Sequence, residues 1–263
     1  MLVSVLASGS KGNSCFVKTN DYNILIDVGM SLRYIKEKLS ELNTSPSDID
    51  YILITHTHSD HVKGIKSFIK KNNPKIVLSD KMLDDLDYLN DYDNLIINKK
   101  GLDLDSVKID YIKTSHDTSD SRAYIIEEDN SSMVYITDTG YINQKHFDKL
   151  INKNLYVFES NHDIEMLMDG PYPSWLKTRI LSDVGHLSNE SSAYYLSKLI
   201  GDNTKKVILA HLSEENNDEA LVLTTMKEKF LEYELDFDEF LIAKQKSKTE
   251  GITIWFKLFV LEN

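Results

Sequence analysis

Residues 51–61 read Tyr-Ile-Leu-Ile-Thr-His-Thr-His-Ser-Asp-His, and we interpret the rest of the chain from this stretch. Its first four residues form a short apolar run of the kind that fills a buried strand. Directly after it, His56, His58, Asp60 and His61 place three imidazoles and one carboxylate within six positions. Imidazole binds zinc, iron, manganese and copper, and carboxylate suits the harder of these ions. Because the chain has only eight histidines in 263 residues, we interpret the cluster as a metal-binding motif rather than as a polar turn.

Three further potential ligands follow hydrophobic runs later in the chain, namely His116, Asp138 and His211. Any one of them alone is more typical of a turn or of a satisfied polar residue. Side chains at the carboxyl ends of strands gather at one edge of a sheet, where ligands bind. We therefore expect these three residues to join the cluster at 56–61.

The composition describes an ordinary globular protein, with 41% hydrophobic and 27% charged residues. A lone Cys15 cannot form an intramolecular disulfide, which is compatible with a reducing compartment. The segment Met1–Ala7 has no basic lead-in of a signal peptide, and no apolar run approaches the ~18 residues of a membrane span. We expect a cytoplasmic protein without a membrane partner.

The net charge of −12 argues only weakly against nucleic acid as a partner, because bound metal ions would add local positive charge.

We predict a single domain over residues 1–263, since no linker or repeat divides the sequence. Apolar periodicity alone supports α/β or α+β. The predicted strands are Leu2–Leu6, Cys15–Lys18, Asn23–Ile26, Tyr51–Ile54, Lys75–Leu78, Val107–Ile112, Ala123–Ile126, Met133–Ile136, Leu155–Phe158, Lys206–Leu209 and Gly251–Phe256. The predicted helices are Leu32–Leu42, Lys63–Asn72, Lys81–Leu89, Asn143–Ile151, Asn189–Leu199 and Asp218–Leu235.

The pattern His-x-His-x-Asp-His, followed by His, Asp and His at later strand ends, resembles the metallo-β-lactamase superfamily. The resemblance implies a four-layer αββα sandwich with two divalent ions at one sheet edge. Nitrogen and oxygen ligands suit both Zn²⁺ and Mn²⁺, with Fe as a further possibility, so the sequence leaves the metal open. Asp27, in Ile26-Asp27-Val28-Gly29, matches an early Asp-x-Gly of the superfamily that supports a ligand; a simple turn residue stays open as the alternative. Carried over by position, the resemblance implies a first ion on His56, His58 and His116, a second on Asp60, His61 and His211, and a bridging Asp138.

A narrower resemblance, to the YycJ (WalJ) family, rests on several short motifs. They are Ser8–Ser14, Glu159–Asp163, Tyr172-Pro173 with Leu176–Ile180, Gly185–Asn189 and His211–Asn217. This resemblance implies a metal-dependent phosphodiesterase acting on DNA, a 5′→3′ double-strand exonuclease linked to mismatch repair. The oligomeric state stays open.

Two divalent ions about 3.5–4 Å apart can activate a shared water for phosphodiester hydrolysis, so no Ser or Cys nucleophile is required. We predict Asp60 and His186 as catalytic residues. His186 would contact the scissile phosphate or protonate the leaving oxygen, and a helix cap before Asn189 is its alternative. The residues predicted to bind substrate are Asn13, Asn161, His162, Lys177 and Arg179, of which Asn161 and His162 fit turns equally well.

Other reactions share this ligand set. A glyoxalase II-like thioesterase and a tRNA-processing RNase stay open as alternatives. A β-lactam hydrolase is disfavoured, because the position of Asp138 is often a Cys in that group. A di-iron oxidoreductase and a non-catalytic binding module are more remote hypotheses, the former because such proteins typically have Glu at the position of His58.

Overall fold

Two sheets of seven strands form the centre of the fold, in a computed structural model that describes residues 1–254. The strands of the first sheet are β1 (Leu2–Ala7), β2 (Ser14–Lys18), β3 (Asn23–Ile26), β4 (Tyr51–Leu53), β5 (Lys75–Leu78), β6 (Leu95–Ile97) and β14 (Ile252–Thr253). Those of the second are β7 (Leu102–Asp103), β8 (Val107–Lys113), β9 (Arg122–Glu128), β10 (Ser131–Ile136), β11 (Leu155–Glu159), β12 (Lys206–Ala210) and β13 (Phe240–Ile242).

The order of the strands is β14-β1-β2-β3-β4-β5-β6 in one sheet and β13-β12-β11-β10-β9-β8-β7 in the other. Each sheet joins an antiparallel part to a parallel part. In the first sheet β3, β4, β5 and β6 run parallel, and in the second β10, β11, β12 and β13 do. Parallel strands bring their carboxyl ends to the same edge, which is the edge that carries the predicted ligands.

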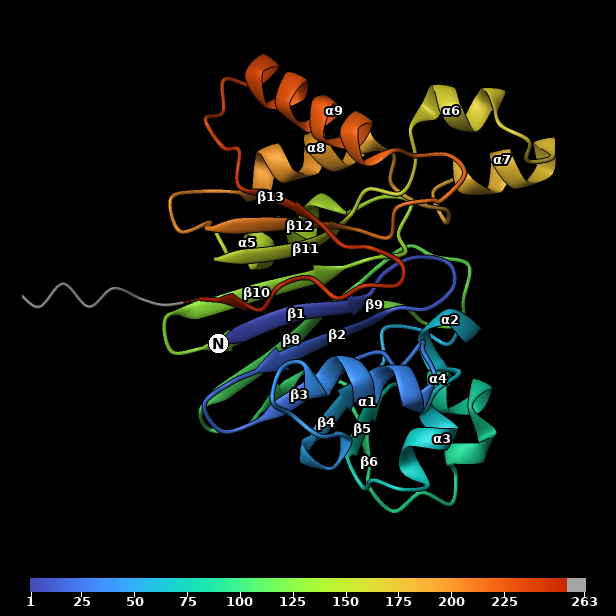
Figure 1. Cartoon of the computed structure of the whole chain (residues 1–263), viewed down its shortest axis with the longest axis vertical. Helices are drawn as coiled ribbons and strands as arrows, with labels where there is room; N and C mark the ends of the chain where they lie inside the picture. The colour runs from blue at the N-terminus through green and yellow to red at the C-terminus, as the bar shows by residue number, and fades with distance from the viewer. Residues whose placement is uncertain (255–263) are drawn as a thin grey trace, which may run out of the picture.

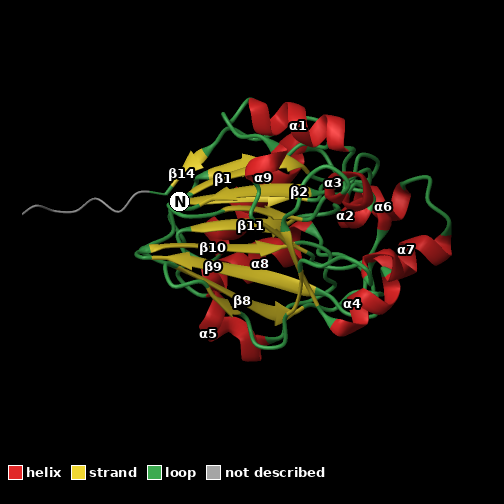
Figure 2. Cartoon of the chain, turned by 90° about the horizontal axis from the view of Figure 1, so that it is seen from below, coloured by secondary structure: helices red, strands yellow, loops and turns green. Residues whose placement is uncertain are grey.

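Helices cover the outer faces of both sheets (Figures 1 and 2). They are α1 (Leu32–Ser40), α2 (Ser59–Val62), α3 (Ile65–Ile69), α4 (Asp80–Asp85), α5 (Phe147–Leu150), α6 (Ile164–Asp169), α7 (Ser174–Ile180), α8 (Asn189–Leu199) and α9 (Glu219–Glu232). Short 3₁₀ turns add η1 (Pro46–Asp48), η2 (Asp87–Leu89) and η3 (Gln144–His146). Among the described residues, none of these helices combines the length and the hydropathy of a membrane-spanning segment.

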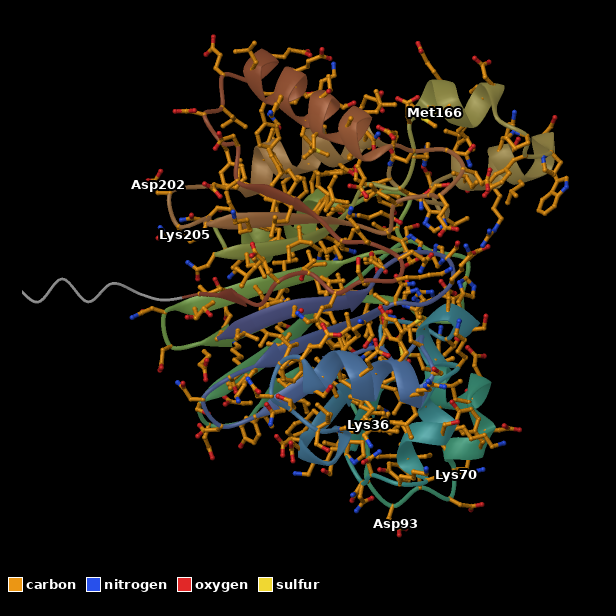
Figure 3. All side chains as sticks on the ribbon, viewed as in Figure 1. Lys36, Lys70, Asp93, Met166, Asp202 and Lys205 are labelled. Atoms are coloured by element: carbon orange, nitrogen blue, oxygen red, sulfur yellow. The ribbon has the colours of Figure 1, made fainter. Side chains whose placement is uncertain are left out.

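Three apolar cores hold the layers together. The core between the sheets contains Val5 of β1 and Tyr135 of β10, each 1% exposed. A second core packs α8 and α9 on the outer face of the second sheet, and a third packs α1 and α3 on the first. Charged side chains such as Lys36 and Asp202 point away from these layers (Figure 3). The predicted αββα sandwich is therefore confirmed.

Several predicted boundaries differ from the structure. Of the helix predicted over Lys63–Asn72, only the part that forms α3 is an α-helix. The unpredicted α2 precedes it, and the two are separated at Gly64, where a Cβ would lie 2.1 Å from the carbonyl oxygen of Met30. Helix α4 likewise ends before η2. Strands β6, β7 and β13 and helices α6 and α7 are present without having been predicted. Of the strand predicted over Gly251–Phe256, the last two residues lie outside the described residues.

Candidate metal centre

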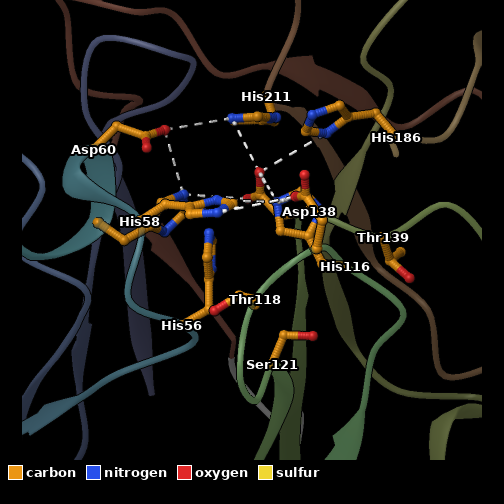
Figure 4. A network of polar contacts seen from close by, with 12 residues as sticks. His56, His58, Asp60, His116, Thr118, Ser121, Asp138, Thr139, His186 and His211 are labelled. Carbon is orange, nitrogen blue, oxygen red and sulfur yellow. Dashed lines mark hydrogen bonds and ion pairs between the residues drawn. The ribbon is translucent and has the colours of Figure 1, made fainter. Parts of the chain in front are cut away.

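The chain leaves β4 and enters α2 through the histidine motif, which places its four polar side chains at the carboxyl edge of the first sheet. His56, His58 and His116 offer ligand atoms that all lie within 4.8 Å of one another. A second group with the same property consists of Asp60, His61 and His211. In Figure 4 the labelled members of the two groups face a common centre; they are His56, His58, Asp60, His116 and His211.

Asp138 lies between the two groups and touches both. Its Oδ2 is 3.2 Å from Nε2 of His61, and its Oδ1 is 3.5 Å from Nε2 of His211. The same Oδ1 is 3.9 Å from Nε2 of His116, in the first group. Asp138 is 3% exposed, so its carboxylate faces the histidines rather than water. A carboxylate in this position can be shared by two cations.

Outer hydrogen bonds fix how the imidazoles point. Nδ1 of His61 donates to Oδ2 of Asp27 at 2.7 Å, and Nδ1 of His116 donates to the carbonyl of Gly185 at 3.3 Å. Each bond assigns the proton to Nδ1, so that Nε2 is the nitrogen that can bind a cation, as in metal-binding histidines generally. In this structure Nε2 of His61 is 2.9 Å from Nδ2 of Asn13, and Nε2 of His116 is 3.2 Å from Nδ1 of His58. Asp27 also accepts from the backbone N–H and the hydroxyl of Thr55, at 2.8 and 2.7 Å. In this structure, then, Asp27 supports a neighbouring imidazole.

The atoms that face the centre suit a cation. Nε2 of His56 and Nε2 of His211 are buried and have no hydrogen-bond partner anywhere in residues 1–254. Buried polar atoms are normally paired, because an unpaired one loses its hydration without compensation. Imidazole nitrogens together with carboxylate oxygens are the donors that zinc, manganese and iron accept. The residues present therefore fit a divalent metal site.

Without metal, the carboxylates and histidines of the centre shift one another's protonation. Burial opposes the charged form of Asp138, yet His211 and His61 hold the pKa of its carboxyl well below the usual range. Burial also opposes a charge on His211, yet Asp138, Asp60 and Glu159 raise the pKa of its imidazole to about 10. Burial lowers the pKa of His56 well below its ordinary value. The cluster thus holds positive charge on some imidazoles and excludes it from others.

Three residues of the site share an unusual backbone conformation. Asp27, Asp138 and His211 have φ angles of 61°, 59° and 57°, in the left-handed region. They follow β3, β10 and β12 respectively, so that each strand ends in a sharp turn. Such conformations are costly for residues other than glycine and concentrate at functional sites. Here the turn directs each side chain to the centre or to the imidazole beside it.

Glu159, the last residue of β11, supports two imidazoles, and the sequence analysis did not identify it as a site residue. Its Oε1 accepts from Nδ1 of His186 at 2.8 Å and from Nδ1 of His211 at 3.1 Å. Its Oε2 accepts from the backbone N–H groups of Thr139 and Leu187, at 3.1 and 3.2 Å. Burial raises the pKa of the Glu159 carboxyl, but His186 and these bonds lower it to about 2. An acid at the end of an apolar strand is the same signal that pointed to Asp138.

His186 lies beside the centre. Its ring centroid is 5.2 Å from those of His116 and His211, and its Nδ1 is 3.8 Å from Oδ1 of Asp138. Its side chain is 14% exposed, so a molecule at the centre can reach it. His186 also belongs to a group of possible ligands with Asp138, Glu159 and His211. Its position therefore meets the geometric requirement for a catalytic group.

The predicted substrate-binding residues Asn13, Asn161 and His162 lie behind the ligands. Asn13 is 0% exposed, and its Nδ2 is 3.1 Å from Oδ2 of Asp60. Nδ2 of Asn161 donates to the carbonyl of His211 at 2.7 Å. His162 is 1% exposed, burial lowers its pKa to about 4, and neither ring nitrogen has a partner among the described residues. Asn13 and Asn161 are thus placed to support ligands, whereas the imidazole of His162 is buried without a hydrogen bond to any of them.

The predicted cations Lys177 and Arg179 both lie on α7. Nε and Nη2 of Arg179 donate to the two carboxylate oxygens of Asp117, at 2.6 and 2.9 Å. Oδ1 of Asp117 is in turn 3.5 Å from Nε2 of His116. Nζ of Lys177 donates to the carbonyl of Met168 on α6, at 2.5 Å. A single residue, Asp117, therefore links Arg179 to the candidate ligand His116, whereas Lys177 bonds to α6 instead.

Comparison with known proteins identifies the family. A model of the metallo-beta-lactamase superfamily matches residues 8–211. The chain belongs to the metallo-β-lactamase superfamily. It is 37% identical over 239 residues to exodeoxyribonuclease WalJ of Streptococcus pneumoniae, covering 88% of this chain and 89% of that protein. It is 36% identical over 221 residues to exodeoxyribonuclease YycJ of Bacillus anthracis, covering 81% and 83%.

Solved structures of other proteins have the same fold. YhfI of Bacillus subtilis matches with a TM-score of 0.71 at 17% identity, over 95% of this chain and 99% of that one. The short form of human tRNase Z matches with a TM-score of 0.64 at 13% identity, over 95% and 98%. At such low identity the likeness concerns the fold alone. The resemblance to the superfamily and to the YycJ (WalJ) family is confirmed.

In this metallo-β-lactamase fold the candidate ligands come from both sheets. His56, His58, Asp60 and His61 follow β4 of the first sheet, whereas His116, Asp138 and His211 follow strands β8, β10 and β12 of the second. Each of the two groups of ligands combines residues from both sheets. The centre therefore lies where the two halves of the sandwich meet.

Proposed function

We propose that this protein is a metal-dependent exodeoxyribonuclease that hydrolyses phosphodiester bonds of DNA with two divalent ions, Zn²⁺ or Mn²⁺. The observation that carries the proposal is the position of Asp138 within reach of His61, His211 and His116, which belong to the two groups of ligands. The identity to exodeoxyribonucleases WalJ and YycJ over most of the chain supports DNA as the substrate. The cytoplasm, where free thiols such as that of Cys15 persist, is the proposed location.

The two ions would be held by different residues. His56, His58 and His116 would hold the first, Asp60, His61 and His211 the second, and Asp138 both. Bound in this way, divalent cations supply Lewis acidity, lower the pKa of water to near 7 and offset the charge of a phosphate. Asp60 would also orient the attacking water. Its carboxylate belongs to the second group of ligands, with Oδ2 3.5 Å from Nε2 of His61. No nucleophilic side chain is needed.

His186 would provide the proton that the leaving oxygen requires. The bond from its Nδ1 to Glu159 commits that nitrogen to the carboxylate and leaves Nε2 to act on the substrate. Nε2 is then the atom that contacts the scissile phosphate or protonates the leaving oxygen. Glu159 would stabilise the imidazolium, because its buried carboxylate is 2.8 Å away. This pairing supports general acid catalysis by His186.

We also propose how DNA is contacted. Arg179 would bind a phosphate near the scissile one, and Lys177 a phosphate further along the strand, as exposed cations do on nucleic acids. For Asn13 and Asn161, burial favours a role in holding the ligands over direct contact with substrate. The 5′→3′ direction, the preference for duplex DNA and the link to mismatch repair are expectations from the family resemblance.

The test is digestion of a 5′-phosphorylated duplex labelled at its 3′ end, with Mn²⁺, Zn²⁺ or Fe²⁺ added to metal-free protein. We expect stepwise shortening from the 5′ end, together with hydrolysis of bis-p-nitrophenyl phosphate. A tRNA precursor and a glutathione thioester are run in parallel as substrates of the alternative reactions. Turnover of the thioester alone, or of the tRNA precursor alone, would refute the proposal.

A matched pair of variants isolates the role of the centre. Asp138→Ala should abolish hydrolysis and reduce the metal content while the protein stays folded. Asp105→Ala is its control, because Asp105 is another aspartate with a left-handed backbone, φ 62°, in the turn between β7 and β8. We expect Asp105→Ala to retain activity and metal. Equal activity of the two variants would contradict the assignment of Asp138.

A further inference from the structure

Exposed apolar side chains concentrate around α6 and α7. Of the ten large hydrophobic residues that are exposed in the described part of the chain, five lie between residues 164 and 184, in or directly after these helices. Trp175, on α7, is 69% exposed. Tryptophan is usually well buried, so an indole left in water needs an explanation. Figure 1 shows α6 and α7 standing away from the sheets, on the side of the molecule where α2 carries the histidine motif.

Trp175 is connected to the metal centre through Arg179 and Asp117. The two residues are four positions apart on α7, so their side chains lie on the same face of the helix. Arg179 pairs with Asp117 at 2.6 Å, and Asp117 lies 3.5 Å from His116. One helical turn, a rise of roughly 5–6 Å, separates Trp175 from Arg179 along the helix axis. This rise corresponds to about two nucleotide steps of one strand of a duplex.

We propose that Trp175 is a stacking platform for a nucleobase of the DNA substrate, close to the phosphodiester at the metal centre. The inference rests on the proposed function and adds a residue that determines how the substrate is held. The indole would stack on the face of a base, while Arg179 contacts a neighbouring phosphate. Both contacts come from one face of α7. The helix as a whole carries two cations, Lys177 and Arg179, and has no acidic residue.

Stacking suits this protein better than a broad basic surface would. The chain carries a net charge of −12, so general attraction of the phosphate backbone is weak. Stacking on an aromatic ring does not depend on charge, and it tolerates any sequence because every base has a π face. A contact of this kind suits an exonuclease that degrades DNA of any sequence. A nucleobase is therefore the occupant that we assign to the exposed indole.

The test compares Trp175→Ala with Leu231→Ala. Leu231, on α9, is 81% exposed and serves as the matched control for loss of an exposed apolar side chain. For Trp175→Ala we expect the KM for duplex DNA to rise about 5- to 150-fold, the range that loss of one base–aromatic stack produces. Its kcat/KM for bis-p-nitrophenyl phosphate, which has no base, should stay at the wild-type value. Trp175→Phe should recover part of the DNA affinity. Leu231→Ala should leave the kinetic constants for both substrates at the wild-type values.

The other possible outcomes overturn either the stacking inference alone or the proposed function as well. An unchanged KM for DNA in an active Trp175→Ala enzyme overturns the stacking inference and leaves the proposed function intact. Failure of the wild-type enzyme to cleave DNA, with bis-p-nitrophenyl phosphate still hydrolysed, overturns both. An equal loss on both substrates also overturns the inference, because it would mean that Trp175 maintains the structure of the site.

Fluorescence provides an independent readout. The chain has two tryptophans, so Trp255→Phe leaves Trp175 as the sole indole. Titration of this variant with a hydrolysis-resistant phosphorothioate duplex should quench its emission with the same midpoint as binding. Unchanged emission at saturating DNA overturns the inference. So does a dimer, measured by analytical ultracentrifugation, that Trp175→Ala converts to a monomer without changing DNA binding, since the patch would then be an interface between two copies.

Discussion

Replacing Glu159 by Gln tests whether the carboxylate behind the site controls the metal ligands. Glu159 accepts four hydrogen bonds, two from imidazoles on Oε1 and two from backbone N–H groups on Oε2. A glutamine has the same shape but only one oxygen. If that oxygen keeps the backbone bonds, the amide nitrogen faces the Nδ1–H groups of His186 and His211, and donor meets donor.

The expected size of the effect follows from this geometry. To avoid two opposed donors, the imidazole of His211 must give up its Nδ1 proton, and the neutral ring then carries the proton on Nε2, which faces the centre. A protonated Nε2 cannot bind a cation. Loss of such an outer partner typically weakens metal binding or activity by 10- to 100-fold, which is about 1.4–2.7 kcal/mol. We expect a loss in this range for Glu159→Gln.

The assay is calorimetric titration of metal-free protein with Mn²⁺, accompanied by DNA hydrolysis at low and saturating metal. Glu128→Gln is the control, because Glu128 is also a buried glutamate, 3% exposed, at the opposite end of its strand from Arg122 and the metal centre. It accepts from the backbone N–H of Asn20 at 2.6 Å and pairs with the amino terminus at 3.4 Å. Glu128→Gln should lower the melting temperature without weakening metal binding. Wild-type metal affinity and turnover in Glu159→Gln would refute the reasoning.

Three further predictions concern catalysis, proton release and packing. His186→Ala should lower kcat by about 10²- to 10⁴-fold with little loss of bound metal, the range for a lost general acid; equal losses of activity and of metal, by elemental analysis, would indicate a structural role. In metal-free protein burial opposes the charge on His211, but the neighbouring carboxylates raise its pKa to about 10. At neutral pH that imidazole is protonated, so metal binding should release a proton and tighten as the pH rises toward 10, which titrations in buffers of different ionisation enthalpy detect; the absence of proton release would contradict the assigned ligand. Gly64→Ala should lower the melting temperature strongly, because its Cβ would lie 2.1 Å from a backbone carbonyl oxygen, whereas Gly251→Ala meets only a side chain at 3.3 Å; similar melting curves for the two would contradict this.

The sequence predicted the long elements of the fold and missed the short, partly exposed ones. Strands such as β9 and β10 are six or seven residues long and largely buried, so their apolar residues stand out. Strands β6, β7 and β13 have two or three residues each, none of them fully buried. They are too short to show the alternation of apolar and polar residues that predicts a strand. Helices α6 and α7 bury one residue each, Leu167 and Ile180, so no apolar stripe reveals them. The break at Gly64 arises from a close approach of Met30, which is distant in sequence.

The candidate site was more predictable than its surroundings. The ligands follow strands that end at one edge, and this rule brought His116, Asp138 and His211 to the histidine motif. The same rule applies to Glu159 at the end of β11. The sequence instead led us to predict site roles for Asn161 and His162, the polar residues that follow shortly after it. Asp117 was missed because its role depends on Arg179, more than 60 positions away in the chain. Supporting residues of this kind depend on tertiary contacts that no local pattern contains.

The origin of the ligands in both sheets has a consequence for the lifetime of the protein. Each proposed ion would tie the two halves of the sandwich together, so binding contributes to the free energy of unfolding as well as to catalysis. A ligand at about a thousand times its Kd adds about 4 kcal/mol to that free energy. Molecules deprived of metal would therefore open more often and be cut sooner by proteases. Inactive copies would be removed selectively, and the abundance of this enzyme in a cell would follow the supply of its ions.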